Sequence, residues 1–137
     1  MYIVFGNKIV DSNDFKTIIE SNSHFKVVKD MSKGSKRDDV IAFNISISVD
    51  ILKEILEDDF SLADLSEDEI FDELMTLSEE LGTDLEEFMP EDSIINVESY
   101  KWDISDNDIK SILIIVHDDF SQGKLKDISK RLKTQVE

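Results

Sequence analysis

The chain has 137 residues, 40% apolar and 34% charged, with four glycines and one proline, a composition typical of one compact globular domain. Its formal net charge of −17 disfavours direct binding to nucleic acid or to an anionic membrane surface, because both are polyanions. The absence of cysteine excludes disulfides, thiolate catalysis and the common cysteine-containing zinc sites.

The amino-terminal segment is typical of a β-strand and lacks the charged stretch, the long apolar stretch and the cleavage site of a secretion signal. The longest apolar run, Ile112 to Val116, has five residues, whereas a membrane-spanning helix needs about 20. We therefore expect a soluble, cytoplasmic protein that does not bind membranes.

Hydrophobic periodicity and turn residues divide the chain into strands and helices. Strands are predicted near residues 2–10, 24–31, 40–49, 94–103 and 109–117. Helices are predicted over residues 13–21 and 122–134, with a helical block that extends to residue 89. The order βαββ, helices, ββα predicts an α+β fold in which helices cover an antiparallel sheet of four or five strands. No repeat or flexible linker interrupts the chain, so we expect a single domain over residues 1–137.

Two of the predicted strands carry clear facial patterns. Residues 41–49 alternate strictly, with large apolar side chains on one face and small or uncharged polar side chains on the other. Residues 112–116 are apolar on both faces, the pattern of a strand covered on both sides, so this strand is expected near the centre of the sheet. The predicted core contains Phe43, Ile45, Ile47, Leu74, Leu113 and Ile115.

The acidic charge is concentrated in residues 50–92, here called the acidic segment. It contains 18 of the 32 acidic residues and one basic residue, Lys53. The rest of the chain carries 14 acidic and 14 basic residues and is neutral as a group. The whole net charge therefore belongs to one segment between two strand-rich parts.

Capping signals define the helices of the acidic segment. Ser66 and Glu69 form a capping-box pattern, which predicts that a helix starts there. Apolar residues then recur at helical spacing, and acidic residues occupy the opposite arc. Gly82 is the expected C-cap of this helix. Residues 83–86 form a second capping-box pattern, and Pro90 is expected to end the short helix that follows.

From Glu54 to Asp92 no basic residue occurs, and this uniform sign favours a binding role. Ordinary solvated helix faces mix charges, because opposite charges at i and i+4 stabilise a helix by about 0.2–0.5 kcal/mol and like charges oppose it. A dense array of carboxylates on a rigid helix can imitate the phosphates of a nucleic acid and occupy a basic groove. We expect a partner to be bound by Asp68, Glu69, Asp72, Glu73, Glu79, Glu80, Asp84, Glu86 and Glu87.

The favoured function is a non-enzymatic inhibitor or adaptor that occupies the nucleic-acid-binding site of a basic protein partner, without contacting nucleic acid itself. The analogy with phage anti-restriction, anti-CRISPR and nuclease-immunity proteins is one of charge alone. One alternative is that the acidic face only solubilises the protein. Another is a small-molecule or metal-responsive binding domain, with a pocket lined by the uncharged face of strand 40–49. No cofactor is expected.

Three short motifs resemble catalytic or metal sites, and each has a simpler explanation. Residues 103–108 resemble part of a calcium loop but lack its glycine and its final glutamate, so we expect a turn. The nuclease-like triplet at residues 108–110, Asp-Ile-Lys, arises easily by chance in such a charged chain. The two aspartates after His117 are expected to complement the N-terminus of the last helix. We expect neither enzymatic activity nor a bound metal.

Two basic stretches lie outside the acidic segment. Residues 33–37 are expected at the solvated tip of a hairpin. The last helix is rich in cations, which suit a helix C-terminus. Its basic residues are Lys124, Lys126, Lys130, Arg131 and Lys133. Two arrangements remain open, since this helix can pack beside the acidic segment and neutralise part of it, or pack elsewhere.

Overall fold

The computed structural model describes residues 1–59 and 61–136. The elements, in chain order, are β1 (Tyr2–Phe5), β2 (Lys8–Asp11), α1 (Ser12–Asn22), β3 (Lys26–Asp30), the 3₁₀ helix η1 (Lys33–Ser35), β4 (Ile41–Ser48), α2 (Val49–Glu57), the 3₁₀ helix η2 (Leu62–Asp64), α3 (Glu67–Asp84), the 3₁₀ helix η3 (Leu85–Phe88), β5 (Ser93–Asp103), β6 (Asp108–His117) and α4 (Gln122–Thr134). None of the helices in these two ranges is both long enough and apolar enough to cross a membrane.

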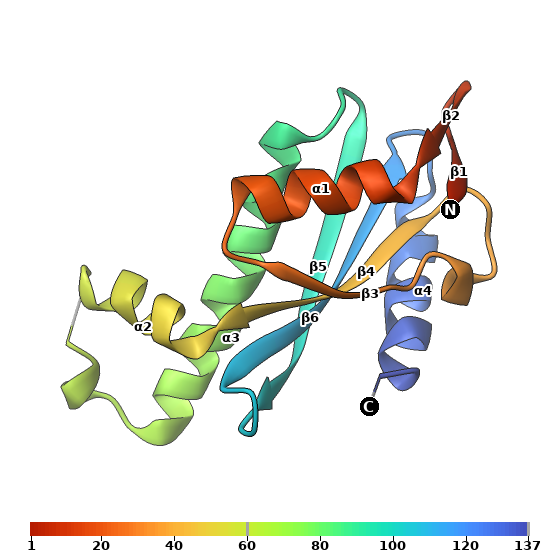
Figure 1. Cartoon of the computed structure of the whole chain (residues 1–137). Coiled ribbons are helices and arrows are strands. Elements are labelled where there is room, and N and C mark those ends of the chain that lie inside the picture. Colours follow the sequence, from red (N-terminus) through yellow and green to blue (C-terminus); the bar gives the residue numbers. More distant parts are fainter. Residues whose placement is uncertain (60, 137) are drawn as a thin grey trace.

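The fold is α+β, as predicted, and is built on a four-stranded antiparallel sheet with the strand order β3-β4-β6-β5 (Figure 1). Strand β6 is central, between β4 and β5, in agreement with the apolar character of both of its faces. The predicted core residues on β4, α3 and β6 are all buried. Alternation along β4 and the continuous apolar run in β6 therefore located the core correctly.

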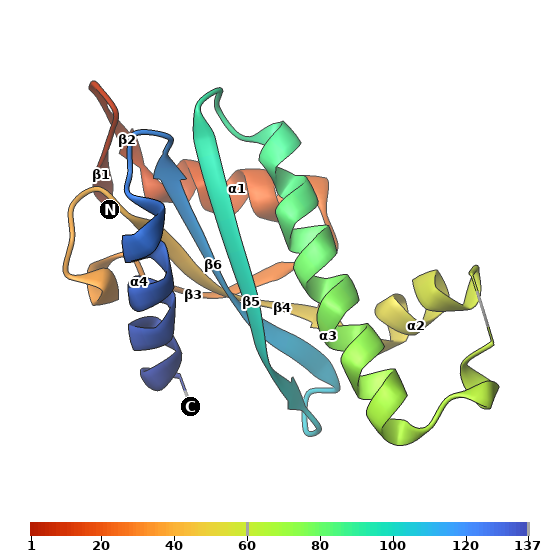
Figure 2. The ribbon, with the colours of Figure 1, turned by 180° about the vertical axis from the view of Figure 1, so that it is seen from behind.

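Helices cover both faces of the sheet. Buried residues of α1, α2 and α3 share one hydrophobic core with one face of β4 and β6. Buried residues of α4 form a second core with the other face, including Ala42 and Ile114. The two views show α1 in front of the sheet and α4 behind it in Figure 1, and the reverse in Figure 2. The acidic helix α3 and the basic helix α4 thus pack on opposite faces.

The first predicted strand, residues 2–10, is instead a separate two-stranded hairpin, β1–β2, outside the four-stranded sheet. Phe5 pairs with Lys8, so Gly6 and Asn7 form a two-residue turn. Gly6 has a φ of +63°, which glycine adopts without steric cost. A Cβ at this position would lie 2.6 Å from Nε2 of His117. The Gly-Asn pair is a recognised hairpin signal that the prediction of one continuous strand overlooked.

Helix α3 begins as predicted but ends later. The Ser66 side chain accepts a hydrogen bond from the backbone N–H of Glu69 at 3.2 Å, and the Glu69 carboxylate accepts one from the backbone N–H of Ser66 at 3.2 Å. The predicted C-cap at Gly82 is wrong, because α3 continues to Asp84. The second predicted capping box is also wrong, because the Thr83 hydroxyl donates to a carbonyl one turn earlier inside the helix.

Gly82 has a packing role instead of a capping role. It is buried, and a Cβ added to it would lie 2.9 Å from both methyl groups of Val97 on β5. A residue without a side chain therefore lets α3 approach the sheet closely at this point. Nearby, buried hydroxyl groups join helix to sheet, since Oγ of Ser111 lies 3.2 Å from Oγ of Ser78 and 2.9 Å from Oγ of Ser99.

A β-bulge in β5 changes which side chains face α3. The pairing register with β6 shifts between Ser99 and Lys101, and such a bulge reverses the alternation of the residues that follow it. Trp102 consequently lies on the α3 side of the sheet, where its ring stacks on Phe71 with 6.5 Å between ring centroids. Without the bulge, Trp102 would share the face of Tyr100, whose hydroxyl donates to Oδ1 of Asn44 at 2.9 Å.

Candidate functional site: an acidic surface on α3 and η3

The predicted partner-binding residues form a nearly continuous exposed surface. All of them except Glu79 are exposed, because the apolar stripe of α3, with Leu74 fully buried at its centre, packs on the sheet. The name acidic surface is used below for Asp68, Glu69, Asp72, Glu73, Glu80, Asp84, Glu86 and Glu87.

Glu79 does not belong to the acidic surface, although the sequence pattern placed it there. It is only partly exposed, and its carboxylate accepts a hydrogen bond from the backbone N–H of Ser99 at 3.0 Å. Strand β5 is an edge of the sheet, so this N–H lacks a neighbouring strand. Helical periodicity shows which arc of α3 carries the acidic residues, but it does not show that one edge of this arc lies against β5.

Ion pairs among the described residues do not neutralise the negative charge of the acidic surface. Among residues 1–59 and 61–136, no acidic side chain from 50 to 92 takes part in a salt bridge. Lys53, the basic residue of this segment, places its Nζ 5.9 Å from the centre of the Trp102 ring. The carboxylates therefore face solvent with their charge uncompensated at short range.

The basic helix α4 does not pack beside the acidic segment, which decides between the two arrangements left open by the sequence. It contacts η1, where Nη2 of Arg131 donates to the carbonyl oxygen of Ser35 at 2.6 Å. The two basic stretches thus lie next to each other on the face of the sheet away from α3. Lys133 forms an ion pair with Glu98, a residue of β5 outside the acidic segment. The basic helix α4 and the acidic helix α3 therefore lie on opposite faces of the sheet.

An apolar hollow of about 190 Å³ lies at the C-terminal end of the acidic surface. Its apolar walls come from four parts of the chain, namely Phe25, Ile47, Ile55, Leu81, Leu85 and Phe88. The exposed residues His24, Asp84 and Glu87 also border it. The Phe88 side chain keeps 43% of its surface exposed, although it is large and apolar.

A second apolar patch lies near the other end of α3. Phe71 is 40% exposed and stacks on Trp102 at an interplanar angle of 20°. Lys53, Glu67, Ile70 and Ile104 complete the surroundings of the Trp102 ring. Phe71 and Lys53 both contact the Trp102 ring, and an open hollow of about 450 Å³ lies beside it.

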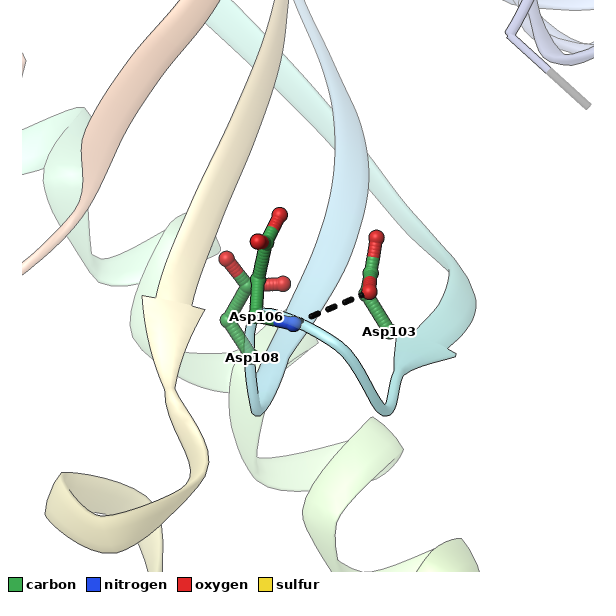
Figure 3. A group of neighbouring side chains, drawn as sticks. All are labelled: Asp103, Asp106 and Asp108. Carbon is green, nitrogen blue, oxygen red and sulfur yellow. Dashed lines mark hydrogen bonds between the residues drawn. The ribbon is translucent and has the colours of Figure 1, made fainter.

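The turn between β5 and β6 gathers three carboxylates in a group that could hold a cation. Ligand atoms of Asp103, Asp106 and Asp108 lie within 4.8 Å of one another (Figure 3). The backbone N–H of Asp106 donates to Oδ1 of Asp103 at 3.1 Å, which is the side-chain closure of an ordinary turn. The sequence had predicted a turn at these residues.

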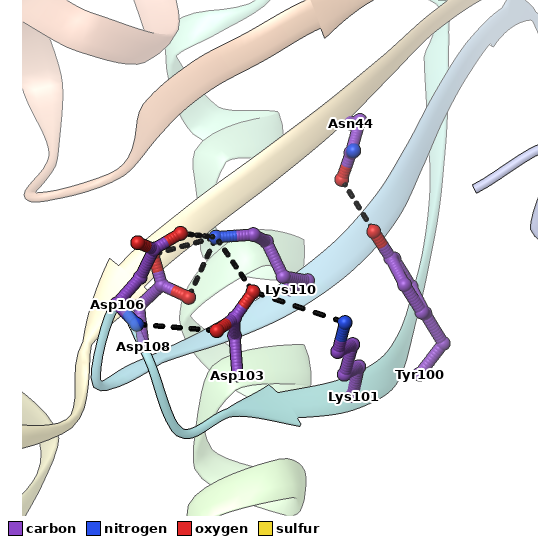
Figure 4. Close-up of polar contacts among 7 residues, drawn as sticks. All are labelled: Asn44, Tyr100, Lys101, Asp103, Asp106, Asp108 and Lys110. Carbon is purple, nitrogen blue, oxygen red and sulfur yellow. Dashed lines mark hydrogen bonds and ion pairs between the residues drawn. The ribbon is translucent and has the colours of Figure 1, made fainter. Parts of the chain in front are cut away.

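A lysine ammonium group already lies among these carboxylates. Nζ of Lys110 is 2.8 Å from Asp108, 3.0 Å from Asp106 and 3.8 Å from Asp103 (Figure 4). Burial lowers the pKa of Lys110, but hydrogen bonds to Asp108 and Asp106 and the negative charge of these two residues together outweigh it and raise the pKa above its ordinary value. The pKa of Asp103 is lowered, first by the hydrogen bond from the Asp106 backbone and then by the nearby lysines. Lys110 thus supplies the positive charge that a metal would bring.

The uncharged face of β4, which the small-molecule alternative would use, is largely covered. Ala42 packs in the α4 core, and Asn44, only 7% exposed, accepts a hydrogen bond from the Tyr100 hydroxyl. Burial raises the pKa of Tyr100, and the hydrogen bond to Asn44 opposes that shift. Side chains of α4 and β5 therefore pack against this face, where the small-molecule alternative would require a pocket.

His117 contacts both aspartates that follow it. Its Nδ1 lies 3.2 Å from Asp118 and 3.0 Å from Asp119, and its ring meets Phe5 edge-on at 5.3 Å. The expected capping role of the two aspartates is wrong, because α4 begins only at Gln122 with Ser121 at its N-cap. A turn closed by the Phe120 backbone N–H and the His117 carbonyl separates them from the helix.

Comparisons of the chain with protein-family models, with curated proteins and with solved structures found no match, so the interpretation of the acidic surface depends on its own geometry.

Proposed function

We propose that the protein is an inhibitor or adaptor that binds a basic protein partner through the acidic surface. The observation that carries this proposal is the row of exposed carboxylates on α3 and η3, none of which forms an ion pair with another described side chain. Like charges at i, i+4 cost helix stability. A partner that supplies lysines and arginines removes that repulsion on binding.

The spacing of the carboxylates supports a nucleic-acid-binding site as the target. The acidic surface has eight acidic residues between positions 68 and 87, and at a rise of about 1.5 Å per residue they extend over about 28 Å. The average is about one charge per 4 Å, with a gap of about 10 Å between Glu73 and Glu80, and the average is close to the spacing of about 3.4 Å per phosphate along one DNA strand. A groove that binds a phosphate backbone therefore presents cations at a compatible spacing.

Rigidity of α3 also supports the proposal. The capping box fixes its start, Leu74 is fully buried beneath it, and Ser78 joins it to β6. Carboxylates held on a docked helix lose less conformational entropy on binding than carboxylates on a mobile loop. The partner class that fits best is a nuclease or another enzyme with a basic nucleic-acid groove, which the bound protein would block.

Charge reversal of the acidic surface tests this function. A variant with four exposed acids changed to lysine should lose binding to a partner recovered by affinity capture, while circular dichroism shows an intact fold. The changed residues are Asp68, Asp72, Glu73 and Glu80. A matched control makes the same change in charge outside the acidic segment, at the exposed residues Asp14, Asp38, Asp118 and Asp127. Titration calorimetry should show full binding by the control, and equal loss in both variants would contradict the proposal.

A further inference from the structure

The apolar hollow next to Phe88 differs from the rest of the exposed surface of the acidic segment. It is bordered by Asp84 and Glu87 of the acidic surface, and its walls join the end of α3 to α2, β4 and the turn after α1. Its volume of about 190 Å³ exceeds the roughly 150 Å³ of an apolar cavity that holds a benzene molecule. One aromatic or branched aliphatic side chain therefore fits into it.

Charge complementarity by itself does not give a tight complex. Long-range attraction speeds the encounter of two proteins, whereas affinity depends on a few buried anchors, commonly aromatic side chains in pockets surrounded by polar residues. The acidic surface supplies the attraction. The hollow supplies a pocket with apolar walls and two carboxylates at its border, which is the surrounding that such an anchor requires.

We propose that this hollow receives one large apolar side chain of the basic partner, flanked in the partner by lysine or arginine residues that pair with Asp84 and Glu87. This inference rests on the proposed function, because the same partner occupies the acidic surface. The Trp102 patch is the less suitable anchor site, because the ammonium group of Lys53 lies 5.9 Å from the centre of the Trp102 ring and would repel the cations that flank the anchor.

Two short synthetic peptides serve as probes for the hollow. The first is Lys-Lys-Trp-Lys-Lys and the second is Lys-Lys-Ala-Lys-Lys, so that the two differ only in the central side chain. In amide NMR spectra the tryptophan peptide should shift the signals of Leu81, Leu85 and Phe88, and it should bind at least tenfold more tightly. The alanine peptide should shift only signals of the acidic surface, and both peptides should bind less at high salt.

Two matched variants locate the anchor site. Phe88 and Phe71 are exposed to similar extents, 43% and 40%, and lie at opposite ends of the acidic surface. Phe88→Ala should remove most of the preference for the tryptophan peptide, while Phe71→Ala should leave that preference intact. A preference lost only in Phe71→Ala would place the anchor at the Trp102 patch and overturn the inference.

The outcomes separate this inference from the proposed function. Equal binding of both peptides at the acidic surface would overturn the anchor and leave the charge-based function standing. Failure of both peptides to bind, at low salt and with the fold intact, would count against the anchor and the acidic surface together. A tryptophan peptide that binds the hollow equally well after Asp84 and Glu87 are changed to lysine would support the pocket and contradict its coupling to a basic partner.

Discussion

The carboxylate of Glu79 accepts a hydrogen bond from the backbone N–H of Ser99 at 3.0 Å, so that α3 covers part of the open edge of β5. The opposite edge of the sheet has a similar contact, in which Glu20 of α1 accepts from the backbone N–H of Val27 at 3.1 Å. Edge strands expose unpaired backbone groups that promote aggregation. A helix glutamate satisfies one such group on each edge strand, β3 and β5.

Glu79→Ala should therefore destabilise the fold by about 1 kcal/mol, the typical contribution of one intramolecular hydrogen bond. The adjacent Glu80 is exposed, and Glu80→Ala should change stability by less than about 0.5 kcal/mol. Urea unfolding of the two variants measures the difference. Equal stability of the two variants would show that the contact with Ser99 contributes nothing.

Leu74→Ala should destabilise the protein by about 2–5 kcal/mol, because it leaves a cavity beneath the centre of α3. Leu74 is fully buried in the larger core. The exposed Thr76 on the same helix provides a control, since Thr76→Ala should have little effect. Thermal and urea unfolding test both, and a loss below about 1 kcal/mol for Leu74→Ala would contradict the packing of α3 described above.

Gly82→Ala should destabilise the protein although alanine favours a helix by about 1 kcal/mol over glycine. The new methyl group would meet both methyl groups of Val97 at 2.9 Å, and such overpacking costs about 1–3 kcal/mol. Val97 is a stiff β-branched side chain on β5. In a Val97→Ala background the clash disappears, so the same substitution should become neutral or stabilising. A double-mutant cycle measured by urea unfolding provides this test.

Lys110→Met should leave Asp103, Asp106 and Asp108 without their shared cation. Lys110 is 12% exposed, and hydrogen bonds to charged groups contribute about 1.5–3 kcal/mol each, so we expect a loss of that order at neutral pH. Circular dichroism during urea unfolding measures it. The same experiment on Lys101→Met, where the side chain is 54% exposed, should show less than about 1 kcal/mol.

The stability difference between the wild type and Lys110→Met should depend on pH at both extremes. The backbone hydrogen bond from Asp106 is the largest cause of the lowered pKa of Asp103, and Lys110 is one of the groups that lower it further. The part of this effect that Lys110 supplies is present above the unfolded value of about 3.9 and is lost as pH falls through the lowered pKa. The pKa of Lys110 is raised, so its contribution is present below about 10.4 and is lost as pH rises through the raised pKa. A difference that stays constant below pH 3 would argue against the cluster as its origin.

Binding of the partner should weaken steeply with salt. Charges on exposed surfaces are screened beyond about 10 Å at 0.1 M salt and beyond about 3 Å at 1 M, whereas apolar burial is not screened in this way. The association rate should carry much of the loss, because steering acts on the encounter. Heparin or duplex DNA should compete for the same basic groove. Stopped-flow or surface-based kinetics across a salt series measures both effects, and insensitivity to both would indicate that the acidic surface only solubilises the protein.

The sequence determined the features that depend on neighbouring residues along the chain. Alternation in β4 and the apolar run in β6 predicted the sheet and its central strand, and the capping box at Ser66 predicted the start of α3. The concentration of negative charge in residues 50–92 was also visible in the sequence, because charged residues can be counted without knowledge of the fold. These signals arise from local sterics, capping and periodic burial, which act over a few residues.

The tertiary structure decided the features that depend on contacts between distant segments. The sequence did not show that α4 packs on the face of the sheet opposite α3. This placement keeps the basic helix away from the acidic surface, which stays exposed. It did not show that a bulge turns Trp102 toward Phe71, that Glu79 serves an edge strand, or that four segments enclose the apolar hollow. Periodicity assigns a side chain to a face of its own helix or strand, but only packing decides what lies against that face.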